Sequence, residues 1–176
     1  PVMSRQLKES MSKAENHQLK RTPKDMPGEI HVQIQTVSSC NARCVFCPYP
    51  DSWHASHPGR MSEEVFEKIL IELKSYPIGK ICPYFENEPL MDHELIYRIQ
   101  RMKAELRFRC LEVSTNGSLL TPGLSRQLID VLSPVEHEVW ISIPGVEPDA
   151  YRETTGLDFH RTLERVIGFL QMADGL

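Results

Sequence analysis

The fold is decided by residues 30–37, IHVQIQTV, and by residues 40–47, CNARCVFC, which follow almost directly. In the first stretch, polar and apolar residues alternate with a period of two, and β-branched residues predominate, which is typical of a strand. In the second, Cys40, Cys44 and Cys47 stand within a single loop. We therefore expect three thiols just beyond the carboxyl end of a strand.

Further strand and helix patterns alternate downstream of this loop. Pro83 predicts an irregularity in the second strand, because proline cannot donate to a strand ladder. Alternating strands and helices predict an α/β fold with parallel pairing, either a TIM-like barrel or an open doubly wound sheet. We expect four βα units, with strands at 30–37, 80–85, 109–114 and 138–143. Helices capped by Ser62 and Asp92, a third helix that begins at Thr121-Pro122, and a last helix over 159–170 separate and follow these strands.

The composition narrows the class of protein. The chain has 176 residues, of which 40% are hydrophobic, and its net charge of −4 comes from 20 basic and 24 acidic residues. These charges are mixed along the chain, so neither a nucleic acid nor a membrane surface is expected as a partner. No apolar run approaches the roughly 20 residues that span a bilayer, and no signal peptide is evident. We expect a cytoplasmic protein with a polar arm at 1–28 and one domain at 29–176.

The grouped cysteines suit a shared metal better than a disulfide framework. Three thiolates in one loop could bind three corners of a [4Fe–4S] cluster and leave the fourth iron open to a small molecule. A tetrahedral zinc site completed by His54 or His57 is an alternative that the residue types also allow. The two remaining cysteines are expected to be small buried apolar residues of the strands, Cys82 and Cys110.

Four motifs resemble those of one family. The C-x3-C-x2-C spacing with Phe46 before the third cysteine resembles the signature of the radical S-adenosylmethionine (SAM) superfamily. Residues 86–90, ENEPL, resemble its Gly-Gly-Glu-Pro motif, although both glycines are replaced. Residues 114–117, STNG, and 141–145, ISIPG, resemble segments that line the SAM site, although Pro144 stands where the family usually has aspartate.

This resemblance spans about residues 29–170 and implies part of a partial (β/α)6 TIM-like barrel, with two more strands beyond Leu176 in a longer protein. It implies a [4Fe–4S] cluster and SAM as cofactors. By the same resemblance, Glu88 would contact the SAM amino group. The other implied cofactor-binding residues are Asn116, Ser142 and Phe46, and the implied cluster ligands are Cys40, Cys44 and Cys47.

The implied activity is reductive cleavage of SAM to a 5′-deoxyadenosyl radical, which then abstracts a hydrogen from a substrate. The cysteine loop is similar to that of SPASM/twitch enzymes, so we expect oxidation or epimerisation of a carbohydrate, an aminocyclitol or a peptide. A flavodoxin- or ferredoxin-like protein would donate the electron. The resemblance names no catalytic base or hydrogen donor. A protein that keeps the cluster but has lost SAM cleavage remains an alternative, because the two glycines and the last strands are missing.

Overall fold

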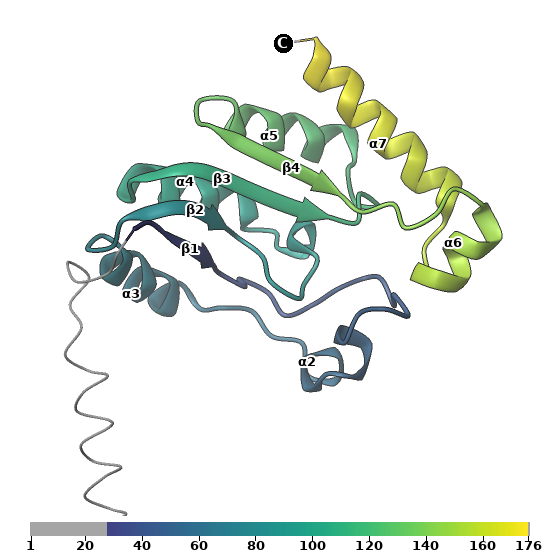
Figure 1. The fold of residues 1–176 in the computed structure, drawn as a ribbon, viewed down its shortest axis with the longest axis horizontal. Helices are drawn as coiled ribbons and strands as arrows, with labels where there is room; N and C mark the ends of the chain where they lie inside the picture. Colours follow the sequence, from purple (N-terminus) through teal and green to yellow (C-terminus); the bar gives the residue numbers. More distant parts are fainter. Residues whose placement is uncertain (1–27, 176) are drawn as a thin grey trace, which may run out of the picture.

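The computed structural model describes residues 28–175 and contains one parallel sheet (Figure 1). Its strands lie in the order β1-β2-β3-β4, so each strand pairs with the next one along the chain. This arrangement confirms the predicted α/β fold of βα repeats and is that of part of a TIM-like barrel. The strands are β1 (Ile30–Gln33), β2 (Ile78–Cys82), β3 (Phe108–Thr115) and β4 (His137–Ile141).

Four longer helices pack against the sheet and share its main hydrophobic core. Phe66, Ile99, Leu128 and Phe169, one from each helix, are at most 5% exposed within that core. The shorter elements lie near the end of the sheet to which the strand arrows point in Figure 1. The longer helices are α3 (Glu63–Leu73), α4 (Leu95–Glu105), α5 (Pro122–Leu132) and α7 (Phe159–Asp174), and the shorter elements are η2 (Tyr49–Asp51), α2 (Trp53–Ser56), η3 (Pro89–Met91) and α6 (Pro148–Thr155).

One of the two expected helix caps, Ser62, is confirmed, and Thr121 caps the helix that was expected to begin there. The Ser62 hydroxyl accepts the N–H of Val65 at 3.3 Å, and the Thr121 hydroxyl accepts the N–H of Leu124 at 3.3 Å. The expectation that Asp92 caps α4 is wrong, because the N-cap is Glu94. The 3-10 turn η3 extends the chain before α4, and the Asp92 carboxylate accepts the N–H of Glu94 at 3.0 Å instead.

The strand boundaries differ from the sequence expectation for identifiable reasons. β2 begins at Ile78 and ends at Cys82, because Pro83 cannot continue the ladder. β1 ends at Gln33, after which the N–H of Ile34 makes one more bond to the carbonyl of Cys82 at 2.8 Å. As expected, Cys82 and Cys110 are buried, with 4% and 1% of their surface exposed.

The expected N-terminal arm, residues 1–28, lies outside the described residues except for Gly28. Among the helices that the structure describes, none is both long and apolar enough to cross a membrane.

Candidate functional site

The cysteine loop leaves the end of β1 and returns to α3 through a closed stem. The carbonyl of Thr36 accepts the N–H of Met61 at 2.8 Å, and Val37 forms an antiparallel bridge with Arg60. One step further out, the Ser38 hydroxyl accepts the N–H of Gly59 at 2.8 Å. Because these bonds close the stem, all three cysteines lie in one loop at the carboxyl end of the sheet.

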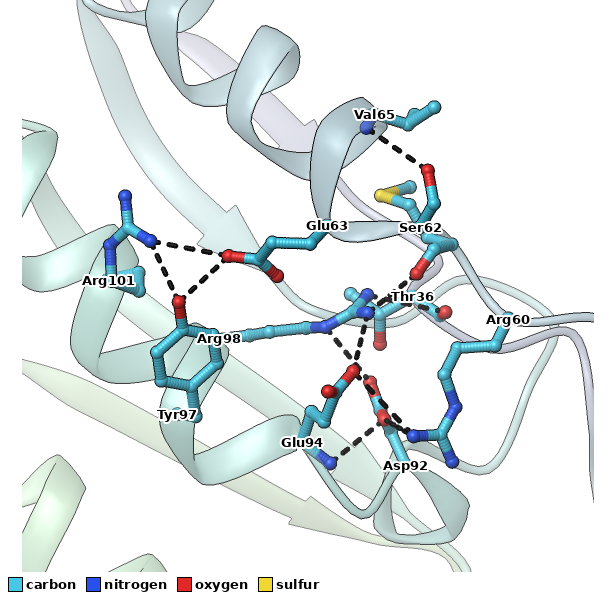
Figure 2. A network of polar contacts seen from close by, with 11 residues as sticks. Thr36, Arg60, Ser62, Glu63, Val65, Asp92, Glu94, Tyr97, Arg98 and Arg101 are labelled. Atoms are coloured by element: carbon cyan, nitrogen blue, oxygen red, sulfur yellow. Dashed lines mark hydrogen bonds and ion pairs between the residues drawn. The ribbon is translucent and has the colours of Figure 1, made fainter.

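A buried arginine of α4 locks this stem (Figure 2). Arg98 is 0% exposed and donates to the carbonyl oxygens of Thr36 at 3.5 Å and Met61 at 2.7 Å, one on each side of the stem. Its guanidinium also pairs with Asp92 at 3.7 Å and with Glu94 at 2.9 Å. Since these carboxylates follow the ENEPL segment, Arg98 joins the cysteine loop to the loop after β2.

The C-terminal end of α6 holds the other side of the cysteine loop. The N–H of Arg43 donates to the carbonyl of Thr155 at 2.8 Å, and the N–H of Val45 donates to the carbonyl of Thr154 at 2.9 Å. Tyr151 of α6, which is 1% exposed, packs with Ala42 in a small second core against which Cys40 and Cys44 also pack. The loop is therefore supported by backbone and by side chains that come from the fourth βα unit.

A clasp of polar side chains joins the cysteine loop to the end of β3. The amide Nδ2 of Asn116 donates to Oδ1 of Asn41 at 2.9 Å, and Nδ2 of Asn41 donates to the Ser118 hydroxyl at 2.8 Å. The Ser118 hydroxyl in turn donates to Oδ1 of Asn116 at 2.6 Å. The Asn116 side chain is thus largely committed to positioning the residue that follows Cys40.

Glu88 is the most deeply buried of the predicted cofactor-binding residues, with 2% of its surface exposed. Its Oε1 accepts the Thr115 hydroxyl at 2.6 Å and the N–H of Leu90 at 3.1 Å, and its Oε2 accepts the N–H of Asn116 at 2.8 Å. Burial raises the pKa of this carboxyl group, and the three hydrogen bonds act in the opposite direction. A carboxylate offers about four acceptor positions, so one position on Oε2 remains free.

All of the residues predicted to bind the cluster or SAM line one pocket of about 190 Å³. Phe46 stands at its rim, 65% exposed, and Ser142 is held there by a bond from its N–H to the carbonyl of Thr115 at 2.9 Å. A larger hollow of about 740 Å³ lies between α5 and α7 and contains no cysteine. We regard the smaller pocket as the candidate site, because it alone of these two gathers thiols and a buried carboxylate. Its predicted residues are Cys40, Cys44, Cys47, Phe46, Glu88, Asn116 and Ser142.

The chemistry of the thiols suits an iron–sulfur cluster. Burial raises the pKa of Cys40 to about 11, and burial together with the charge of Cys47 raises the pKa of Cys44. Three neighbouring thiolates therefore need cations, which the irons of a cluster supply. Within residues 28–175, no three cysteine, histidine, aspartate or glutamate side chains converge closely enough to hold a single metal ion. In a cubane each thiolate binds a different iron, so such close convergence is unnecessary.

The histidines of the zinc alternative lie elsewhere. His54 and His57 line a separate pocket beside the stem of the loop, and this pocket contains none of the cysteines. The ring of His57 stacks on Trp53 with centroids 4.4 Å apart, and its Nδ1 lies 3.2 Å from the carbonyl oxygen of Trp53. The geometry therefore gives no support to a zinc site that is completed by either histidine.

Several residues that shape the site were not predicted from the sequence. Arg98 lies among the apolar positions of α4, where the periodic pattern alone suggests another core residue. Its spacing of four residues from Glu94 was the available signal, because such pairs share one helix face. Asn41 stands inside the cysteine motif, but its partner Asn116 is distant in the sequence. The hydrogen bonds from α6 to the cysteine loop are made by backbone carbonyl oxygens, and no pattern of residue types predicts such bonds.

Comparison with known proteins agrees with this geometry. The family model described as "Radical SAM superfamily" matches residues 34–173. Among curated proteins, a GTP 3′,8-cyclase from Xanthomonas campestris pv. campestris (strain B100) is 25% identical over 129 residues, which is 71% of this chain and 37% of that protein. The chain therefore spans little more than a third of the length of this relative.

Two solved structures share the fold at lower sequence identity. Native anSMEcpe with bound AdoMet and Cp18Cys peptide superposes with a TM-score of 0.64 at 20% identity, covering 82% of this chain and 40% of that one. BtrN in complex with AdoMet and 2-DOIA superposes with a TM-score of 0.58 at 21% identity, covering 73% of this chain and 55% of that one. At these identities the likeness concerns the fold.

Proposed function

The chain belongs to the radical SAM superfamily, whose members use a [4Fe–4S] cluster and SAM, and we propose that its candidate site holds these two cofactors side by side. In this proposal Cys40, Cys44 and Cys47 bind three irons, and Glu88 accepts a hydrogen bond from the amino group of SAM. The observation that carries the proposal is that the three thiols and this buried carboxylate line a single pocket.

Contacts from several elements support the cysteine loop. The stem bonds and Arg98 fix the base of the loop, α6 fixes Arg43 and Val45, and the Asn116 clasp fixes Asn41. Glu88 is oriented by three donors, so its free acceptor position on Oε2 has a defined direction. Preorganisation of this kind lowers the entropy cost of binding.

When bound, the cluster supplies one electron for the cleavage of SAM, and the 5′-deoxyadenosyl group that is released takes a hydrogen atom from the substrate. The protein must exclude water and orient SAM while this happens. Ser142 at the end of β4 and Phe46 at the rim of the pocket are positioned to contact SAM beyond its amino group. No residue is assigned as the base or hydrogen donor of the substrate.

For the net reaction we propose oxidation or epimerisation of a carbohydrate, an aminocyclitol or a peptide. The support comes from the sequence of the cysteine loop and from the two solved structures, one bound to a peptide and the other to 2-DOIA. A flavodoxin- or ferredoxin-like protein is proposed as the electron donor. The cyclase relative shows that proteins similar to this chain catalyse other reactions on the same fold.

The cluster is tested by purification and reconstitution without oxygen. We expect a brown protein that contains iron and acid-labile sulfide. Cys44→Ala should lose both the colour and the iron, whereas the matched control Cys82→Ala should keep them, because Cys82 lies on β2 outside the motif. A colourless protein that contains zinc would contradict the proposal.

The chemistry is tested separately on the brown protein. Incubation with dithionite and SAM should release 5′-deoxyadenosine, measured by chromatography and mass spectrometry. A protein that holds the cluster and binds SAM but releases no 5′-deoxyadenosine with any candidate substrate would instead fit the alternative of a cluster protein without catalysis.

A further inference from the structure

Asn87 brings an amide to a position where the resembling family motif has glycine. Its Oδ1 accepts the N–H of Phe85 at 3.0 Å. Because a backbone N–H can only donate, this contact identifies which end of the amide is the oxygen. The Nδ2 at the other end is buried and has no hydrogen-bond partner among the described residues. A buried donor without a partner is unfavourable, so its presence at this place needs a reason.

Asn87, which carries the free donor, directly precedes Glu88, which carries the free acceptor, in the sequence. Both residues line the pocket that also contains the three thiols. The neighbouring amide of Asn116 cannot easily take the role of this donor, because its Nδ2 already donates to Asn41 at 2.9 Å. The pocket therefore offers a carboxylate acceptor and an amide donor from consecutive residues. The head group of an α-amino acid presents the complementary pair, an amino group and a carboxylate on the same carbon.

We propose that Nδ2 of Asn87 donates a hydrogen bond to the carboxylate of the methionine moiety of SAM, while Glu88 accepts one from its amino group. The inference rests on the proposed function, since it assumes that SAM occupies this pocket. Asn87 is then a specificity-determining residue for the amino-acid head group. Its side chain provides a contact that a glycine at this position cannot make.

The test is a cycle between two ligands and two variants, with the cluster reconstituted in every protein. Dissociation constants are measured by equilibrium dialysis for SAM and for decarboxylated SAM, which lacks only the carboxylate. Asn87→Ala removes the donor. Asn87→Asp keeps an oxygen for the N–H of Phe85 and places a negative charge where the donor was. The absorbance of the cluster in each variant reports whether the loop has kept its structure.

We expect Asn87→Ala to weaken SAM binding about tenfold, the effect typical of losing one hydrogen bond to a charged group, and to change binding of decarboxylated SAM less than about twofold. Asn87→Asp should weaken SAM further and leave decarboxylated SAM bound as well as before, or better. Equal losses for the two ligands, or no loss for SAM, would overturn the inference. So would a carboxylate-selective loss in Ser142→Ala that is absent in Asn87→Ala. If the unaltered protein binds neither ligand, the proposed function fails together with the inference.

Discussion

Replacement of Arg98 by methionine should lower the free energy of unfolding substantially. The side chains of Arg98 and Asp92 are both 0% exposed and lie 3.7 Å apart. Loss of the guanidinium leaves the Asp92 carboxylate buried, with Arg60 at 3.8 Å as the one cation that still pairs with it among residues 28–175. It also leaves the carbonyl of Met61 without its 2.7 Å donor. Removing one partner of a buried ion pair typically costs 3–5 kcal/mol, so we expect a loss of about 3–5 kcal/mol of unfolding free energy.

The same helix supplies the matched control. Arg101 lies about one turn further along α4 and pairs with Glu63, as Figure 2 shows, and also with Glu67 and Glu105. All four side chains are partly exposed, so loss of Arg101 leaves no fully buried charge alone. Arg101→Met should therefore cost far less than Arg98→Met. Both variants are compared by urea unfolding followed by circular dichroism, with the dependence of the free energy on urea checked for equality so that the midpoints can be compared.

A second variant separates buried charge from packing. In the double variant Arg98→Met/Asp92→Asn no buried charge is left alone, and the oxygen of the introduced amide can still accept the N–H of Glu94. We expect the double variant to recover more than half of the loss seen in Arg98→Met. The reasoning is refuted if Arg98→Met is no less stable than Arg101→Met, or if the double variant is less stable than the single one.

Two further predictions concern glycine and pH. Gly117 has φ +75°, and an added Cβ would lie 2.8 Å from Cγ2 of Val166, so Gly117→Ala should lower the free energy of unfolding by about 2–4 kcal/mol. Gly168 lies in the middle of α7 with open space around it, so Gly168→Ala should raise the free energy of unfolding by about 0.5–1 kcal/mol. Chemical denaturation measures both changes, and equal effects would contradict the reasoning. Because burial raises the pKa of Glu88 above 4.5, folding favours its protonated form, so the stability of the unaltered protein should fall relative to Glu88→Gln as the pH rises from 4.5 through the folded pKa, and then level off. A relative stability that increases with pH over this window would show that the hydrogen bonds to the carboxylate outweigh burial.

The main architecture, and the gathering of the predicted residues in one pocket, could be expected from the sequence because both depend on local patterns. The alternation at residues 30–37 and the cysteine spacing are readable within a few residues, and parallel strands bring their carboxyl ends to one edge. In contrast, α6 was missed because only Tyr151 and Thr155 of its eight residues are buried, so it carries no apolar stripe. The cap of α4 was misplaced because the turn η3 shifts the helix start, and a turn of that kind depends on the bonds that Glu88 makes.

The contacts that organise the site could not be read from the sequence. Asn116 is predicted to contact SAM, and no pattern in the sequence indicated that its amide also bonds to Asn41 and Ser118. Likewise, the role of Arg98 depends on carbonyl oxygens of Thr36 and Met61, which any residue type would supply. Such partners are fixed by tertiary packing, so they become visible only when the elements are assembled.

The attachment of the cysteine loop to α6 has a consequence for the order of events during synthesis. The cysteines leave the ribosome before α6 does, so Arg43 and Val45 reach the carbonyls of Thr155 and Thr154 only after α6 has been synthesised. Closing so long a stretch of chain is entropically costly and occurs when the packing of α6 offsets the cost. A nascent chain that has not yet reached Thr155 therefore displays its thiols without their finished support, and iron delivered at that stage meets an open loop.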